Sequence, residues 1–393
     1  MRRDSEAAIF WLTAASAAAS LISIAAMEIL LAAACLLWLY KRSPFKWPPY
    51  TLPLLAFMAT TVISLAASSN PSVGRHPIQK FVLFSMGLLT VAFVTTESRA
   101  RSAYKLLMAT ATAAAVLAIA QFGFKEITYR NTGLLADDPT LLNRITGPLG
   151  HWMTFSGVQL LVWCAAIPAL MVLGRRWMPT VPIIGTALVL SNTRGAWIGA
   201  AAGFAFVALA LPRRVLVAVL LPMIVVTLAA SPLIYHRVSM SLDKDLATNY
   251  SRGIYLDVGL KMIKAHPLFG VGPERVHDDF PRYYPGRLDT FYYGHLHNNI
   301  LQIAAERGLL CLAAFLWFIV ELYRSLLRQL TNSDDDSRWV TLGALAALTG
   351  FVIAGLTEYN FGDSEVLVLF LFIVSIPFGL ASHVQKDPYS QQG

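Results

Sequence analysis

The amino-acid sequence predicts an all-α integral membrane protein with about twelve transmembrane helices and one large loop outside the bilayer. Of its 393 residues, 56% are hydrophobic and only 14% are charged, which is far from the composition of a soluble domain. Apolar stretches long enough to cross a bilayer recur along the whole chain. Such stretches must be helical, because a backbone amide in lipid has to find its hydrogen-bond partner within its own segment.

These apolar segments make the chain a single polytopic membrane domain over residues 1–393, since no soluble domain of any size remains between them. Short basic clusters, such as Lys41-Arg42 and Arg213-Arg214, separate several of them. In chain order, the expected spans are 7–23, 25–40, 50–68, 79–95, 103–123, 152–173, 178–192, 194–211, 214–231, 298–323, 339–357 and 364–382.

The basic residues predict the orientation, because cytoplasmic connections of membrane proteins carry an excess of Lys and Arg. An even number of spans puts both termini on the same side, and we expect that side to be the cytoplasm. The inner connections then hold Arg2, Arg3, Lys41, Arg42, Lys46, Arg99, Arg101, Lys105, Arg175, Arg176, Arg213, Arg214, Arg324, Arg328, Arg338 and Lys386. The short outer connections hold Arg75, Lys80, Lys125, Arg130, Arg144 and Arg194.

Two outer segments are too long to be simple turns: residues 125–151 and residues 231–297. Within the second, residues 251–265 carry apolar side chains at helical spacing and predict an amphipathic helix on or near the membrane surface. Long loops on a rigid helical scaffold are where function usually lies. The site is therefore expected on the outer face.

The remaining composition excludes several functional classes. The net charge of +8 is spread over short clusters between apolar runs, whereas a nucleic-acid site needs a continuous basic face. The three cysteines lie inside apolar runs without metal-like spacing. Signatures of nucleotide-binding loops, serine hydrolases and zinc enzymes are absent from the sequence. Neither a metal nor another cofactor is expected, and an activated donor would have to arrive from within the membrane.

Arg194 follows Ser191-Asn192-Thr193 and precedes Gly195 between two apolar segments. One interpretation is an interfacial anchor whose side chain snorkels to water. The other is a diphosphate site, since backbone donors at a helix start and a forked guanidinium suit phosphate oxygens. The neighbouring hydroxyl, amide and glycine favour the second interpretation.

Further candidates lie in the large loop. Arg252 begins the amphipathic segment, and Tyr255 follows one turn later; Arg275 stands in Gly272-Pro273-Glu274-Arg275. Each of these charges, taken alone, is also typical of a solvated helix surface. We assign Arg252 to diphosphate binding, and Tyr255 and Arg275 to supporting roles.

The sharpest local feature is Gly294-His295-Leu296-His297-Asn298-Asn299, where the large loop re-enters the membrane. Histidine suits general-base catalysis, because its ordinary pKa is closest to neutrality. A spacing of two residues is not the HExxH pattern of a zinc site, and a purely structural helix cap is the remaining alternative. We assign His297 as the general base, with His295 and Asn298 in support.

These residues resemble the O-antigen ligase and polymerase superfamily. The similarity lies in the multi-span pattern with one late periplasmic loop, in HPLFGVGPERV (266–276) and in HNNILQIAAERGLL (297–310). Arg194 is similar to an arginine that members carry at an outer helix end, Arg252 to one early in the large loop, and His297 to the essential loop histidine.

The resemblance implies a glycosyltransferase-C-like membrane enzyme of the bacterial inner membrane, acting at the periplasmic face in lipopolysaccharide biosynthesis. Its donor would be O-antigen polysaccharide on undecaprenyl diphosphate, and its acceptor a sugar hydroxyl of lipid A-core. The reaction would be inverting and would need neither metal nor nucleotide. Membrane lipids, but no nucleic acid, would be its other partners.

Three alternatives remain open. An O-antigen polymerase would use an acceptor that is itself carrier-linked, and the loop with Arg130 and Arg144 is compatible with that activity. A protein O-oligosaccharyltransferase would use a serine of a pilin. A transporter or flippase should place ionisable residues near the bilayer midplane, whereas the charges here gather at helix ends and in one outer loop.

Overall fold

The computed structural model describes residues 2–42, 45–132, 144–232, 234–235, 239, 247–286, 294–332 and 335–384. Throughout these residues the regular elements are helices, and none of them is a strand. The predicted all-α fold is therefore confirmed. Part of the expected outer loops, including residues 133–143 and 287–293, lies outside the described residues.

Every expected span overlaps a helix of the structure. The corresponding helices are α1 (Arg2–Ala19), α2 (Ile24–Tyr40), α3 (Thr51–Ala67), α5 (Ser85–Phe93), α6 (Glu97–Thr132), α8 (Trp152–Leu173), α9 (Thr180–Leu190), α10 (Arg194–Ala208), α11 (Arg213–Ala229), α15 (Asn299–Asn332), α16 (Asp335–Ala354) and α17 (Ser364–Val384). The 3₁₀ turns η1 (Val73–Arg75) and η2 (Lys80–Phe84), with α4 (His76–Gln79) between them, lead into α5.

The length and composition of these helices agree with a multi-pass membrane protein. Six described segments are long and apolar enough to cross a membrane: Val73–Phe93, Glu97–Thr128, Trp152–Leu173, Asn299–Asn332, Ser337–Ala354 and Ser364–Ala381. Three shorter helices, α2, α3 and α10, are also apolar. The 11 residues of α9 span about 17 Å, which is less than a hydrocarbon core of about 30 Å. The full set of twelve crossings and its orientation stay predictions.

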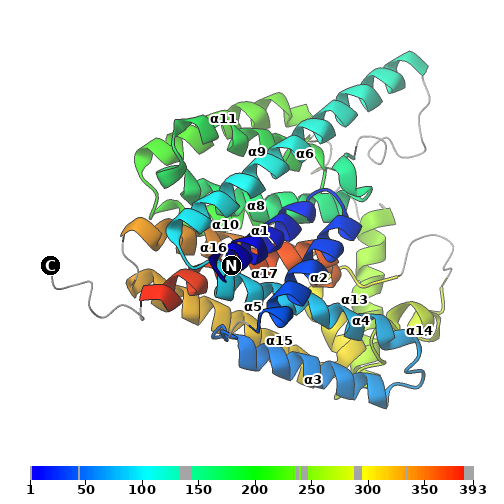
Figure 1. Ribbon diagram of the computed structural model, residues 1–393. Coiled ribbons are helices and arrows are strands. Elements are labelled where there is room, and N and C mark those ends of the chain that lie inside the picture. Colours follow the sequence, from blue (N-terminus) through cyan, green and yellow to red (C-terminus); the bar gives the residue numbers. More distant parts are fainter. Residues whose placement is uncertain are drawn as a thin grey trace.

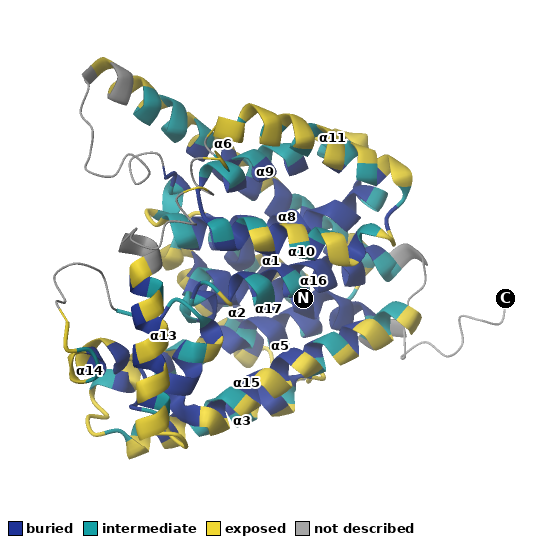
Figure 2. Ribbon diagram, turned by 180° about the vertical axis from the view of Figure 1, so that it is seen from behind, coloured by how far each residue is buried: buried dark blue, intermediate teal, exposed yellow. Residues whose placement is uncertain are grey.

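The core of the bundle is formed by α8, α16 and α17, which lie in its middle and are almost entirely buried (Figures 1 and 2). The outer helices, such as α3, α11 and α15, bury one face and expose the other (Figure 2). Exposed Leu221, Ile224 and Leu228 on α11 show that the exposed faces are themselves apolar. In a membrane protein such faces contact lipid rather than water.

Glycines bring α10 and α16 into close contact. A Cβ atom on Gly199 would lie 2.6 Å from the carbonyl oxygen of Gly350, and one on Gly203 would lie 2.5 Å from that of Ala346. Residues four apart share a helix face, so these glycines let two backbones approach as larger side chains could not. This packing fixes the start of α10 against the end of α16.

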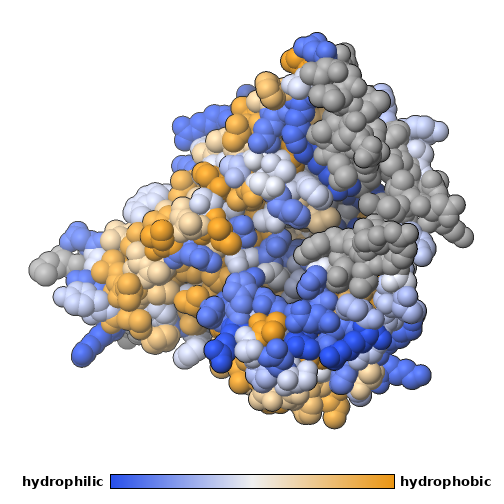
Figure 3. Space-filling view, turned by 90° about the vertical axis from the view of Figure 1, so that its right-hand side faces the viewer, coloured by the Kyte–Doolittle hydropathy of each residue, from blue (hydrophilic) through white to orange (hydrophobic). Residues whose placement is uncertain are grey.

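The non-membrane helices α13 (Ala247–Ala265) and α14 (Val276–Tyr283) gather at one end of the bundle, where α13 runs crosswise to the long helices (Figure 1). Hydrophilic side chains predominate over this end in surface view (Figure 3). The predicted amphipathic helix is confirmed as a helix: Ile254, Val258 and Met262 are buried, whereas Leu256 and Leu260 are exposed. Its position at a membrane surface stays a prediction.

A break at Gly308 divides α15 into a short first part and a long second part. Gly308 has a φ of +79° and no room for a side chain, because the carbonyl of Leu268 occupies that space. Val271 and Gly272 donate backbone hydrogen bonds of 3.0 and 2.8 Å to the carbonyls of Ala305 and Glu306. The loop before α14 is thereby joined to the helix that carries the histidine motif.

Candidate active site

The start of α15 is hydrogen-bonded to the segment that follows α16. The backbone N–H of Asn299 donates to the carbonyl of Gly355 at 2.8 Å, and its Nδ2 donates to Oδ1 of Asn360 at 2.6 Å. Its Oδ1 accepts a hydrogen bond from the backbone of Phe361 at 3.1 Å. The buried asparagine therefore places the histidine motif directly beside residues 355–363.

Asn298 caps α15. Its Oδ1 accepts a hydrogen bond of 2.9 Å from the N–H of Leu301, while its Nδ2 donates to the carbonyl of Leu356 at 2.8 Å. Asparagine is among the favoured capping residues, because its side chain satisfies an N–H of the first helical turn. The cap is therefore the asparagine, and the histidine before it is available for other contacts.

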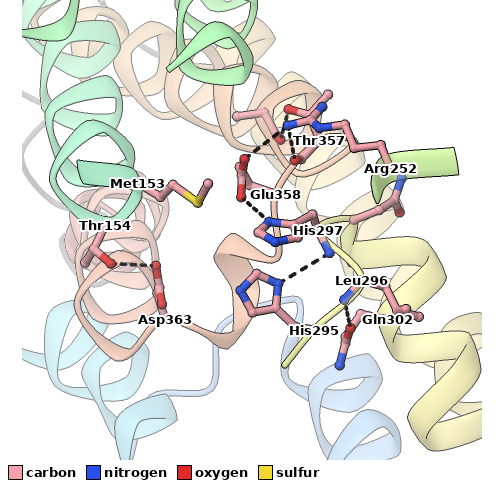
Figure 4. Close-up of polar contacts among 12 residues, drawn as sticks. Met153, Thr154, Arg252, His295, Leu296, His297, Gln302, Thr357, Glu358 and Asp363 are labelled. Carbon is pink, nitrogen blue, oxygen red and sulfur yellow. Dashed lines mark hydrogen bonds and ion pairs between the residues drawn. The ribbon is translucent and has the colours of Figure 1, made fainter. Parts of the chain in front are cut away.

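His297 is held by a carboxylate. Its backbone lies in the left-handed region with a φ of +49°, a conformation uncommon outside glycine. Its Nδ1 lies 3.0 Å from Oε2 of Glu358 (Figure 4). Because an ionised carboxylate can only accept a hydrogen bond, Nδ1 carries the proton and Nε2 keeps its lone pair. This is the tautomer that a general base needs.

Arg252 reaches the same carboxylate. Its Nη2 lies 3.4 Å from Oε1 of Glu358 and donates to the carbonyl of Thr357 at 3.3 Å (Figure 4). Glu358 therefore bridges the candidate base and one candidate phosphate-binding arginine, with one oxygen directed to each.

The start of α10 lies against the same segment. A Cβ atom on Gly195 would collide with Oγ1 of Thr357. The first turn of α10, which begins at Arg194, therefore packs directly against Thr357, the residue whose carbonyl Arg252 contacts. The residue at the N-cap of α10, Thr193, makes no side-chain capping hydrogen bond. Its N–H groups and dipole thus favour an anion. The structure brings Arg252 and His297 to one carboxylate, Glu358, and places the backbone at Gly195, the residue after Arg194, beside Thr357.

His295 has the opposite tautomer. The backbone N–H of His297 donates to its Nδ1 at 3.3 Å, and the two rings lie 4.0 Å apart between centroids (Figure 4). Burial, together with the weaker effects of the nearby His297 and His151, lowers the pKa of His295 to about 3. The ring is therefore neutral near pH 7, and since Nδ1 accepts, its proton is on Nε2.

The two remaining loop candidates differ. The ring of Tyr255 lies 5.2 Å from that of His297, so Tyr255 belongs to the cluster. Arg275 instead is buried in ion pairs with its own helix: Nη2 lies 3.0 Å from Oδ1 of Asp279. Its neighbour Glu274 pairs with His76 at 2.8 Å. Arg275 stabilises the loop, and no described contact joins it to His297.

A second wall faces the histidines. Thr154, near the start of α8, donates to Oδ2 of Asp363 at 3.0 Å, and both lie across from His297 and His295 in Figure 4. Burial raises the pKa of Asp363 to about 6, against the weaker opposing effects of the Thr154 hydrogen bond and the Lys80 charge. The same wall includes His151, whose pKa is lowered, first by burial.

Arg144, from the other long outer segment, is buried, with its guanidinium 4.9 Å above the ring of Trp152. Its carbonyl accepts a hydrogen bond from Lys125 at 2.9 Å. The side chain of Arg130 lies outside the described residues. Within the described part of the chain, no group of three or more His, Cys, Asp or Glu residues is arranged to hold a metal ion.

Sequence reasoning missed Glu358, Asp363 and His151. All three stand at helix ends on the side expected to be external, and each follows or precedes an apolar span. A carboxylate in Thr357-Glu358-Tyr359, just after a span, was the signal for the first of them. Its partner could not be inferred from spacing, because it lies 61 residues away.

Part of the chain matches a known protein family. Residues 179–316 match the family described as O-antigen ligase, and this segment includes Arg194, Arg252 and His297. No curated protein matches the chain.

Proposed function

We propose that the chain, whose residues 179–316 match the family described as O-antigen ligase, is an O-antigen ligase of the O-antigen ligase and polymerase superfamily. It transfers polysaccharide from undecaprenyl diphosphate to a sugar hydroxyl of lipid A-core during lipopolysaccharide biosynthesis. The observation that carries the proposal is the cluster of His297, Glu358 and Arg252, with the start of α10 beside it.

The proton step belongs to His297. A sugar hydroxyl is a weak nucleophile, so a base must take its proton as the oxygen attacks the anomeric carbon. Nε2 of His297 has the lone pair for this step, because Glu358 accepts the proton on Nδ1 at 3.0 Å. Glu358 also stabilises the imidazolium that forms, as the carboxylate of a serine-protease triad does.

The leaving group is the lipid diphosphate. As the bond from the anomeric carbon to the phosphate oxygen breaks, negative charge builds on that oxygen and needs fixed donors. Arg194 and Arg252 are the donors we assign, since a forked guanidinium suits phosphate oxygens. Attack opposite the departing diphosphate inverts the anomeric centre.

The location follows from the chemistry of both substrates, which carry lipid tails. We assign the protein to the bacterial inner membrane as a multi-pass protein of glycosyltransferase-C-like architecture, with cytoplasmic termini and a periplasmic site. Supporting this, the site lies at the end of the bundle where α13 and α14 gather (Figure 1). No cofactor takes part in the proposed reaction.

The test is reconstituted transfer with purified protein, undecaprenyl-diphosphate-linked glycan and lipid A-core, in the presence of EDTA. The wild type should modify lipid A-core, and His297→Ala should not. Glycan that lengthens on its own carrier would instead identify a polymerase. Activity that disappears in EDTA and returns with a divalent cation would overturn the metal-independent mechanism. Absence of any transfer would favour a transporter.

A further inference from the structure

A pocket of about 330 Å³ opens beside His295, the neighbour of His297. One wall is aromatic and includes Phe57, Phe84 and Phe361. Another part of the lining is polar and includes His295, Arg307 and Asp363. The proposed proton and phosphate chemistry uses none of these six residues directly.

We propose that this pocket binds the terminal sugar of the acceptor, one saccharide unit, and so delivers its hydroxyl to His297. This inference rests on the proposed transferase function and adds to it the subsite and the residues that select the acceptor.

The volume fits one sugar unit rather than a chain. Ligand pockets range over about 300–1,000 Å³, and this one lies at the small end of the range. A growing polysaccharide needs an open groove along which its units extend. The terminal sugar of a core oligosaccharide needs a pocket for one ring only.

The two walls match the two kinds of surface on a sugar ring. The C–H face of a pyranose is apolar and packs on aromatic rings, while its hydroxyls require hydrogen-bond partners. Binding sites typically combine an aromatic lining with a few placed polar groups. Here Phe361 lies 5.3 Å from Phe57 between centroids and continues the aromatic wall, while Asp363, two residues later, begins the polar wall.

The polar wall contains a buried donor that the described protein does not satisfy. Arg307 is 7% exposed; its Nη2 donates to the hydroxyl of Tyr359 at 3.2 Å, and its guanidinium lies 5.2 Å above the ring of Phe57. Its Nε has no hydrogen-bond partner among the described residues. Buried donors are nearly always paired. A hydroxyl in the pocket would supply the missing acceptor.

His295 connects the pocket to the base. It lines the pocket, and its ring lies 4.0 Å from that of His297. Because Nδ1 accepts from the backbone of His297, the ring can offer only a donor, Nε2–H, to a sugar oxygen. In Figure 4 the ring of His295 points toward the Asp363 wall. A sugar hydroxyl bound to His295 therefore lies next to the imidazole of His297. In the proposed reaction His297 deprotonates the adjacent hydroxyl of the same sugar.

Two substitutions of His295 separate its two contacts. Gln places an amide at the position of Nε2, whereas Asn places one at the position of Nδ1. His295→Gln should keep the acceptor KM near the wild-type value, and His295→Asn should raise it about tenfold through the lost hydrogen bond. The donor KM should stay unchanged in both.

Lys80 supplies an independent variant. It lines the pocket and donates to the carbonyl of Gly362 at 2.9 Å, next to Asp363. Lys80→Met should raise the acceptor KM about tenfold as well. The matched control is Lys261→Met, which removes an exposed lysine paired with Asp257 on α13 and should leave both KM values unchanged.

The decisive measurement is the acceptor KM and the donor KM for each variant, together with direct binding of lipid A-core to wild type and Lys80→Met. Equal acceptor KM values in all variants would overturn the pocket while leaving the ligase intact. A raised donor KM alone would assign the pocket to the donor. If the wild type transfers no glycan to lipid A-core, the proposed function fails. In that case, equal binding of lipid A-core by the wild type and by Lys80→Met would separately overturn the assignment of the pocket to the acceptor.

Discussion

Glu358 lies 61 residues from His297 in the sequence, yet its Oε2 is 3.0 Å from the imidazole Nδ1. The other oxygen of the same carboxylate lies 3.4 Å from Nη2 of Arg252. One side chain thus sets the tautomer of the proposed base and the position of a proposed phosphate ligand. Loss of its charge should therefore affect catalysis more than folding.

Glu358→Gln should lower kcat by about 10²–10⁴-fold, the range for impaired general-base catalysis and for loss of a histidine-orienting carboxylate. The amide can hydrogen-bond in either ring orientation and does not stabilise an imidazolium. Steady-state kinetics with both substrates check this effect. An unchanged kcat in a folded variant would contradict the role of Glu358.

Arg194→Lys and Arg252→Lys should each lower kcat/KM for the donor at least about tenfold, because an ammonium does not reproduce two parallel contacts to a phosphate. The matched control is Arg328→Lys on the exposed face of α15, far along the helix from the histidines. Wild-type rates in both site variants would refute diphosphate binding by these arginines.

Gly203→Leu should destabilise the protein, since even a Cβ atom there would lie 2.5 Å from the carbonyl of Ala346. Overpacking of this kind costs about 1–3 kcal/mol or more. It should also reduce activity by shifting the start of α10. A lowered thermal midpoint in detergent is the expected result. Gly123→Ala, where a Cβ atom meets nothing within 4 Å, is the control and should not lower the midpoint.

Acid should destabilise the protein through His295. The folded-state pKa is about 3, below the ordinary value of 6.5, so the unfolded chain gains a proton first as pH falls. The free energy of unfolding therefore drops between pH 6.5 and pH 3, by up to about 1.4 kcal/mol per pH unit. Thermal midpoints of His295→Gln should depend less on pH across this window than those of the wild type.

Asp363 should change the pH dependence of the free energy of unfolding in the opposite direction to His295. Its folded-state pKa is about 6, raised by burial from 3.8, so the unfolded chain ionises first as pH rises between these values. Stability should fall as pH rises through the window and then level off. Asp363→Asn should therefore gain stability relative to the wild type from pH 4 to pH 6. A parallel pH profile for both proteins would contradict the assigned burial of this carboxyl.

A reporter enzyme inserted after Asp243, in a part of the loop outside the described residues, should give a periplasmic signal. The expected reason is the excess of basic residues in the opposite connections. A fusion after Arg176 should give a cytoplasmic signal. The reverse pair of signals would overturn the proposed orientation.

The helices were predictable because an apolar segment that crosses lipid can satisfy its own backbone hydrogen bonds only as an α-helix. The ends of α2, α8 and α10 agree with the expected spans to within a few residues. The ends of α9 also lie within two residues of the expected span 178–192. Pro179 before it and the turn at Asn192 after it, with a φ of +57°, limit its length.

The site was predictable only where chemistry and sequence position coincide. Arg252, His297 and Tyr255 lie together in the structure, and all three come from one loop and its re-entry into the bundle. Arg275 looked similar in sequence, but an aspartate one helical turn later neutralises it. Glu358 and Asp363 come from another helix end, so their participation depends on three-dimensional packing that local patterns do not encode.

The family match ends at residue 316, and Glu358 lies beyond it. A chimera that receives residues 179–316 from this chain would thus acquire both arginines and the histidine but would leave their shared carboxylate behind. Such a graft should work only in a host that supplies an acidic residue at the same place after its penultimate helix. The unit of exchange between relatives is then two separate stretches of chain, which must be inherited together.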